Sequence, residues 1–157
     1  MVSFFAFNMF EFVALNKMFA KAKSLDEGRA WIFAIDDGVQ KKVIELNTEV
    51  QLGDDGIDSL GDSLGEYAPF TVNERTSLGL QTGHIDFKVT GDYWRSWRVS
   101  VTNNAIIITV DSSRFDELVN ELRFSPEHVG LTETSLEVIR KMVLPKYQEY
   151  ARRELLS

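Results

Sequence analysis

The chain has 157 residues, 44% of them hydrophobic and 26% charged, and this composition fits one globular domain spanning residues 1–157. It contains no cysteine, which excludes disulfides, thiol catalysis and zinc–thiolate sites. Its formal net charge of -7 argues against a protein that binds nucleic acid through the phosphates.

Residues 1–23 begin with the apolar run MVSFFAFNMFEFVAL. This run lacks the basic start of a signal peptide and contains Glu11. It is also shorter than the roughly 20 apolar residues that a membrane span needs, so we expect no membrane partner. Two interpretations remain open: a helix buried in this domain, or an aromatic arm that packs on a neighbouring subunit through Phe4, Phe5 and Phe7.

A helix is expected over residues 26–47. Ser24 and Glu27 have the spacing of a capping box, in which each side chain satisfies a free backbone amide at the start of a helix. Behind them, apolar residues recur every four positions, as on one face of a helix. These residues are Trp31, Ile35, Val39 and Val43. Gly38 weakens the predicted helix without ending it.

Residues 53–83 are glycine-rich and acidic, have little periodicity, and are expected to form a long loop. A calcium loop of the EF-hand type starting at Asp54 would need an oxygen ligand at its third position and glycine at its sixth, but these positions are Gly56 and Ser59. A loop of this length usually marks function or contact with another molecule. We therefore interpret it as a contact arm that lies on a neighbouring subunit. Its apolar anchors are Ile57, Leu60, Leu64, Tyr67 and Phe70.

The acidity of the chain is concentrated in this region. Residues 53–90 carry seven acidic and two basic residues, a charge of -5, whereas the remaining residues carry 17 acidic and 15 basic residues, a charge of -2. Such a surface repels DNA.

Strands are expected after the loop. HIDFKV, residues 84–89, alternates apolar and polar residues like a half-buried strand. WRVSV, residues 97–101, and AIIITV, residues 105–110, predict a hairpin joined by a short turn.

Two helices complete the chain. A short helix is expected at about residues 112–122, and a last helix starts near Thr132 or Thr134 and ends near Leu155. The predicted fold is therefore α+β: amino-terminal helices, a long loop, a small and mainly antiparallel sheet with a hairpin, and a long carboxy-terminal helix.

His84 and Asp86 are two positions apart on a predicted strand, so both side chains would point to one face, as in an acid–base or metal site. The only other histidine is His128, and the histidine spacings typical of zinc sites do not occur. We favour a histidine that is hydrogen-bonded to a neighbour. The sequence also lacks a nucleophile elbow and a phosphate-binding loop, so we expect no enzyme activity, no metal and no cofactor.

The segment VTGDYWRSW, residues 89–97, breaks the strand alternation at its Thr-Gly step, so a helical turn is expected after Gly91. Aromatic residues interleaved with arginine are typical of interface cores, and tryptophans also suit a core beside a sheet. We expect one tryptophan to anchor the core and the other to point toward another subunit. The interface candidates here are Tyr93, Trp94, Arg95, Trp97 and Arg98.

The order of these motifs resembles that of the small neck and tail-completion proteins of tailed bacteriophages, closest to phages of Bacteroidetes, including the crAss-like group. The resemblance covers about residues 44–150. Three stretches carry it in order: GIDSLGDSLGEYAPFT, QTGHIDFKVTGDYWRSW and VGLTETSLEVI. The chain departs from the pattern at RFSPEHVGLT, where a glycine usually follows the aromatic residue, so a different loop is expected before the last helix.

The resemblance implies a structural virion protein, made in the host cytoplasm, that forms a ring of six or twelve copies at the head–tail junction. Its neighbours would be portal, adaptor or tail proteins, and DNA would only pass through the lumen. Two alternatives remain open. One is a small metal-dependent hydrolase that uses His84, Asp86 and the loop aspartates, and the other is a soluble partner-binding module without a virion role.

Overall fold

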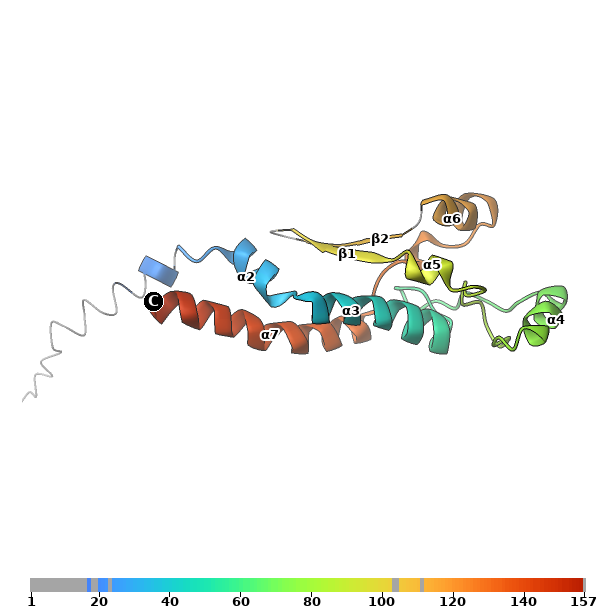
Figure 1. Cartoon of the computed structure of the whole chain (residues 1–157), viewed down its shortest axis with the longest axis horizontal. Coiled ribbons are helices and arrows are strands. Elements are labelled where there is room, and N and C mark those ends of the chain that lie inside the picture. The colour runs from blue at the N-terminus through green and yellow to red at the C-terminus, as the bar shows by residue number, and fades with distance from the viewer. Residues whose placement is uncertain (1–16, 18–19, 23, 103–104, 111, 157) are drawn as a thin grey trace, which may run out of the picture.

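The computed structural model describes residues 17, 20–22, 24–102, 105–110 and 112–156 (Figure 1). In chain order, the elements are α2 (Glu27–Ala34), α3 (Asp37–Glu45), the π-helix η1 (Leu46–Asp55), α4 (Pro69–Ser77), α5 (Asp92–Arg95), β1 (Arg98–Val101), β2 (Ile106–Thr109), α6 (Ser112–Asp116), the π-helix η2 (Glu117–Glu121), the 3-10 helix η3 (Pro126–His128) and α7 (Glu133–Leu156). Helices dominate and the sheet is small and antiparallel, so the predicted α+β class is confirmed. Phe4, Phe5 and Phe7, and with them the alternatives for the amino-terminal run, lie outside the described residues.

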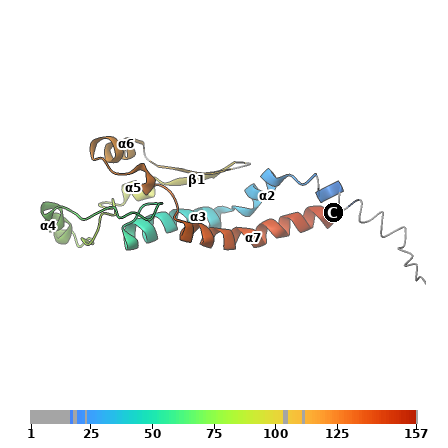
Figure 2. The same ribbon diagram turned by 180° about the vertical axis from the view of Figure 1, so that it is seen from behind.

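The molecule is elongated. The long helix α7 packs against α2 and α3, and β1 packs against α3 from the other side (Figure 1). α4 lies at one end of the long axis, and the carboxy-terminal end of α7 lies toward the other end, as both views show (Figures 1 and 2). Among the helices that the structure describes, none has the length and apolar character to span a membrane.

The predicted hairpin is confirmed. β1 pairs with β2 in antiparallel register, with Arg98 opposite Thr109 and Val101 opposite Ile106. The backbone amide of Thr102 donates to the carbonyl of Ala105 at 2.9 Å and so closes the hairpin beyond the last strand pair. The two turn residues, 103 and 104, lie outside the described residues.

The single helix expected over residues 26–47 is wrong, because the chain forms two helices there. Asp26, rather than a Ser24–Glu27 capping box, starts α2: its side chain accepts the amide of Arg29 at 3.0 Å. The helix stops at Ile35, and the Asp36 side chain accepts the amide of Val39 at 3.0 Å, which starts α3. An aspartate in extended backbone is a strong helix start, and here it interrupts a continuous apolar stripe.

Two apolar clusters form the core. The first joins α2, α3 and α7 and consists of Ala34, Ile35, Val39, Val43, Leu46, Ile139 and Val143. The second lies between the end of η1, the short helix α5 and η2. It consists of Leu52, Leu64, Phe87, Tyr93, Trp97 and Leu118. Each cluster combines residues from distant parts of the sequence, so the elongated molecule is tied together along its length.

The prediction of a long loop over residues 53–83 is also wrong. η1 continues to Asp55, and α4 lies within the segment. Between them, Ile57 and Ser63 form an isolated antiparallel bridge, and Leu64 is buried in the second apolar cluster. Because Ile57 and Leu64 pack within the chain, this part of the segment is internal structure, while contact of the segment with another copy stays a prediction.

Residues 84–89 form no strand, although their alternation predicted one. The backbone bonds instead to groups of other segments: the amide of Ile85 donates to the carbonyl of Gly65, and the carbonyl of Asp86 accepts from the Trp94 indole. Phe87 has a left-handed backbone, with φ of 56°, which no regular strand allows. Backbone groups must be satisfied somewhere, and here side chains and turns supply the partners that a neighbouring strand would.

Gly56 ends η1 with a left-handed φ of 64°, and its amide donates to the carbonyl of Gln51. A Cβ at this position would overlap the imidazole of His84. Gly61 has a similar left-handed φ of 86°, but no atom lies within 4 Å of the place where its Cβ would be.

We therefore predict that Gly56→Ala destabilises the protein more than Gly61→Ala. Both substitutions carry the left-handed penalty of about 1–2 kcal/mol, and only the first adds a collision with His84. Urea denaturation of the two variants provides the comparison. Equal midpoints would show that residue 56 does not pack on His84 as described.

Candidate interaction surfaces and their polar support

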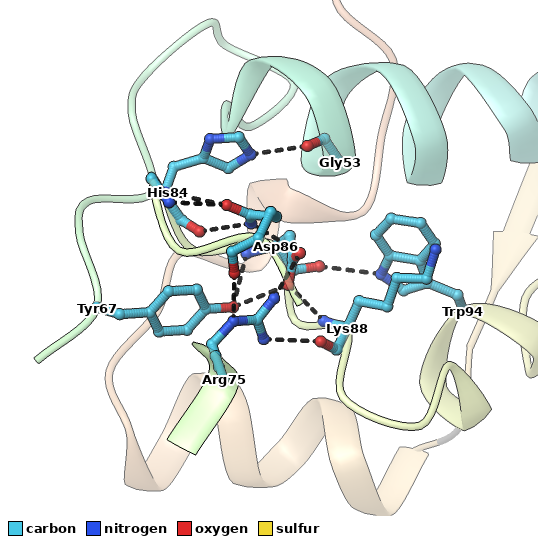
Figure 3. A network of polar contacts seen from close by, with 9 residues as sticks. Gly53, Tyr67, Arg75, His84, Asp86, Lys88 and Trp94 are labelled. Carbon is cyan, nitrogen blue, oxygen red and sulfur yellow. Dashed lines mark hydrogen bonds and ion pairs between the residues drawn. The ribbon is translucent and has the colours of Figure 1, made fainter. Parts of the chain in front are cut away.

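A buried carboxylate fixes α4 to the rest of the chain (Figure 3). The side chain of Asp86 is 3% exposed, and its Oδ2 accepts hydrogen bonds from Arg75 at 2.8 Å and from the Gln81 amide at 2.7 Å. Its Oδ1 accepts from the Tyr67 hydroxyl at 2.8 Å and from the backbone amide of Lys88 at 2.7 Å. Both carboxylate oxygens are therefore fully used inside the protein.

Arg75 comes from α4 and is itself buried, with a side chain that is 4% exposed. Besides Asp86, its guanidinium donates to the carbonyls of Gln81 and Lys88, each at 2.7 Å. It also lies 4.2 Å from the centre of the Tyr67 ring. Burial raises the pKa of Tyr67 to about 12, so its hydroxyl keeps the proton that it donates to Asp86. A buried charge pair is tolerated when its remaining hydrogen-bonding positions are satisfied, as they are here.

His84 lies beside this cluster (Figure 3). Its Nε2 is 2.8 Å from the carbonyl oxygen of Gly53, and because a carbonyl only accepts, this nitrogen carries the proton. The interpretation of a hydrogen-bonded histidine is confirmed, although the residue is not on a strand. His84 and Asp86 thus both bond to groups within the chain. Among the described residues, no group of three or more acidic or histidine side chains is placed to hold a metal ion.

His128 is completely buried where η3 meets α5 and α6. Its Nδ1 donates to the carbonyl of Ser125 at 2.6 Å, so in the neutral ring Nε2 accepts from the hydroxyl of Tyr93 at 2.7 Å. Its ring is stacked on Phe115 with 5.4 Å between the centroids. Burial lowers the pKa of His128 below its ordinary value of 6.5.

Two buried amides tie η1 to the loop before α7. The Asn47 side chain bonds to both the carbonyl of His128, at 3.1 Å, and the amide of Gly130, at 2.8 Å. Gln51, one turn further along, bonds to the carbonyl of Gly130 at 2.8 Å and the amide of Thr132 at 2.9 Å. These bonds were not predicted from the sequence, although Asn47 and Gln51 continue the four-residue stripe that ends at Val43.

The first candidate interaction surface lies at the α4 end, between α4 and η2, and we call it the α4–η2 surface. It contains a groove of about 770 Å³ whose lining is mostly apolar and includes two glutamates, Glu66 and Glu74, and two arginines, Arg75 and Arg114. Its floor includes Ile85, Phe87, Leu118, Leu122 and Phe124. The surface also has exposed apolar side chains on or beside α4 and η2: Phe70, Leu78, Val89 and Leu122.

The second candidate surface is a groove of about 560 Å³ between α2, β2 and α7, which we call the α2–α7 groove. Its apolar lining includes Trp31, Ile35, Ile106, Ile139, Leu144 and Tyr147. Trp31 and Leu144 remain 42% and 56% exposed, respectively. The charged residues of its lining are Glu137, Arg140 and Lys141, so a net positive charge accompanies an apolar surface that extends over three elements.

The two segments that contribute α4 and α7 to these surfaces differ in charge. Residues 53–90, which include α4, carry seven acidic and two basic residues, or -5. Residues 133–156, which form α7, carry four acidic and five basic residues, or +1. The chain is therefore acidic over the segment that contains α4 and slightly basic along α7, while the lining of the first groove itself has two acidic and two basic residues.

The interface candidates of the 53–83 segment are divided by the structure. Leu60 and Phe70 are 71% and 72% exposed, whereas Leu64 is buried at 9%. Ile57 is half-buried, and Tyr67 is also half-buried through its contact with the Asp86 cluster. Only Leu60 and Phe70 thus have side chains largely free for contact with another molecule.

The helical turn predicted after Gly91 is confirmed as α5. Trp97, at 1% exposure, and Tyr93, at 7%, are core residues. Trp94 is half-buried and donates its indole N–H to the carbonyl of Asp86 at 3.0 Å, and Lys88 lies 4.4 Å from its ring centre. The expected division holds for Trp97 as the core anchor, while contact of Trp94 with another subunit stays a prediction. The arginines of this segment, Arg95 and Arg98, are both exposed.

Comparison of the chain with protein-family models, with curated proteins and with solved structures found no match. Functional inference therefore rests on the two surfaces and on the order of the sequence motifs.

Removing the charge of Asp86 should release α4. We predict that Asp86→Asn lowers the free energy of unfolding by about 3–5 kcal/mol, because Arg75 is left as an unpaired buried cation. Urea denaturation measures the change. Asp92→Asn is the matched control, since Asp92 pairs with Arg95 at the surface and its loss should leave the midpoint nearly unchanged. Similar midpoints for both variants would contradict the structural role of the buried pair.

The burial of His128 makes stability depend on pH. Its pKa is lowered in the folded state, so as the pH falls below about 6.5 the unfolded chain takes up a proton first. The free energy of unfolding should then decrease as the pH falls from about 6.5 toward the folded-state pKa, by at most about 1.4 kcal/mol per pH unit, and should level off below that pKa. Measured unfolding curves between pH 7.5 and 5 test this, with His128→Gln as the comparison. The substituted protein should lose this part of the slope, and an unchanged slope would assign it to other groups.

Proposed function

We propose that the protein is a structural component of a tailed-phage virion that joins copies of itself into a ring at the head–tail junction, through which DNA passes. One observation carries the self-association: a single elongated chain presents two different apolar surfaces that are separated along its long axis, one with the exposed Glu74 and the other with the exposed Lys141. A contact between two different surfaces is heterologous, and repeated heterologous contacts form a closed ring when the rotation between copies closes.

The charge of the chain supports this arrangement in two ways. The acidic α4 region and the basic edge of the α2–α7 groove attract each other between copies. The net charge of -7 also suits a channel wall, because DNA is repelled from it and slides without binding. The virion location itself is supported by the order of the motifs over about residues 44–150.

The hydrolase alternative receives less support from the geometry. It needs His84 and Asp86 to act on a bound substrate or metal, but His84 Nε2 bonds to Gly53 and both oxygens of Asp86 accept hydrogen bonds from within the subunit. A partner-binding module without a virion role differs from the ring protein in one measurable respect, since it has no reason to self-associate.

Native mass spectrometry of the purified protein should detect a closed oligomer, with a fixed number of copies equal to six or twelve. Charge attraction contributes to the contact, so raising the salt concentration from about 0.1 M to about 1 M, which shortens the screening length from about 10 Å to about 3 Å, should favour dissociation. Proteomic analysis of purified virions should find the chain in the same copy number. A protein that stays monomeric at high concentration and is missing from virions would contradict the proposal.

A further inference from the structure

Phe70 is an unusual surface residue. At 72% exposure it is the most exposed large apolar side chain among those that the structure describes. It lies in the first turn of α4, whose position is fixed by the buried Arg75–Asp86 pair. Glu74 and Leu78 follow at four-residue intervals, and both are exposed, Leu78 at 64%. Residues four apart share one side of a helix, so the three form an apolar–acidic–apolar ridge, which we call the α4 ridge.

The α2–α7 groove has the complementary features. Its floor and walls are apolar, and Leu144 on α7 and Trp31 on α2 leave much of their surface uncovered. Lys141 lies at its edge and is exposed, and among the described residues it forms no ion pair. Arg140, beside it, is shared between Glu133 and Glu137, so Lys141 is the cation available to a partner.

We propose that the α4 ridge of one copy docks in the α2–α7 groove of the next copy, with Phe70 against Leu144 and Glu74 opposite Lys141. The occupant is a second copy of this chain because the ridge matches the groove in apolar character and in charge. The phenyl group of Phe70 suits the apolar groove, and the carboxylate of Glu74 suits the ammonium group of Lys141. The inference rests on the proposed ring and specifies its repeating contact. Because ridge and groove lie far apart on one subunit, each copy binds one neighbour at each surface.

The absence of cysteine from the chain allows a direct test by disulfide cross-linking. A chain carrying both Phe70→Cys and Leu144→Cys should form a ladder of covalent oligomers on mild oxidation, seen on a non-reducing gel. Each single variant should form no ladder, and an equal mixture of the two single variants should give a dimer and nothing larger. A disulfide needs the two Cα atoms within about 7 Å, so the ladder reports this contact and not association in general.

The control pair is Phe70→Cys with Leu156→Cys. Leu156 is on the same helix as Leu144 and is 70% exposed, but it lies outside the groove, so this pair should give no ladder. Charge reversal adds a second readout. Glu74→Lys and Lys141→Glu should each weaken self-association at least about tenfold, and the double variant should restore it, because the pair is then reversed and not lost.

The outcomes separate this inference from the ring proposal. If the unmodified chain assembles but the Phe70–Leu144 pair cross-links no better than the control pair, the contact is wrong and the ring proposal stands. If assembly resists Phe70→Ser and is lost when residues 1–16 are deleted, the groove is filled by the amino-terminal segment and this inference is overturned. If the unmodified chain neither assembles nor gives a ladder in the cysteine variant, both proposals fail.

Discussion

The ion pair between Arg75 and Asp86 determines where the acidic end of the molecule lies. Arg75 comes from α4, and Asp86 from an irregular segment that also packs on the second apolar cluster. Their side chains are 4% and 3% exposed, and such a pair persists only when its other hydrogen-bonding positions are filled. Tyr67, Gln81 and the backbone of Lys88 fill them, so one buried charge organises residues 67–88 without a strand or a long helix.

A second set of buried polar contacts connects η1 to the segment before α7. Asn47 and Gln51 extend the helical stripe of apolar residues with amides, and these amides bond to backbone groups of residues 128–132. A buried amide without hydrogen-bond partners destabilises the fold. With partners it favours one arrangement of the chain, because it needs donors and acceptors in fixed positions. These contacts therefore set the point where α7 begins, and α7 in turn forms the wall of the α2–α7 groove.

The two sets of buried polar contacts give the proposed assembly a rigid frame. Phe70 projects from α4, and Arg75 of the same helix is anchored in the interior. Little conformational ordering is therefore needed when the α4 ridge binds. The groove is likewise built on α2 and α7, which pack on each other through the first apolar cluster. Surfaces on fixed helices suit a ring in which the same contact repeats between every pair of copies.

The sequence by itself determined the features that depend on neighbouring residues. The hairpin follows from alternation on both sides of a short turn, the α5 turn from the Thr90–Gly91 step, and the start of α7 from a threonine cap, since the side chain of Thr132 accepts the amide of Ser135. These signals are local, and the α+β class is their sum. Only the tertiary structure decided what residues 84–89 do, because their alternation is the same for a strand and for a segment whose partners lie on α4.

The same limit applies to the candidate surfaces. Apolar spacing and the aromatic–arginine pattern made interface candidates of Leu60, Leu64, Phe70 and Trp97 alike. The exposure of each side chain, however, depends on what packs against it. Leu64 and Trp97 are covered by residues from distant segments, whereas Phe70 lies on the outer side of a helix whose inner side is held by Arg75. Burial is a property of long-range contacts, so it was the fold, and not the residue types, that left Phe70 on the surface.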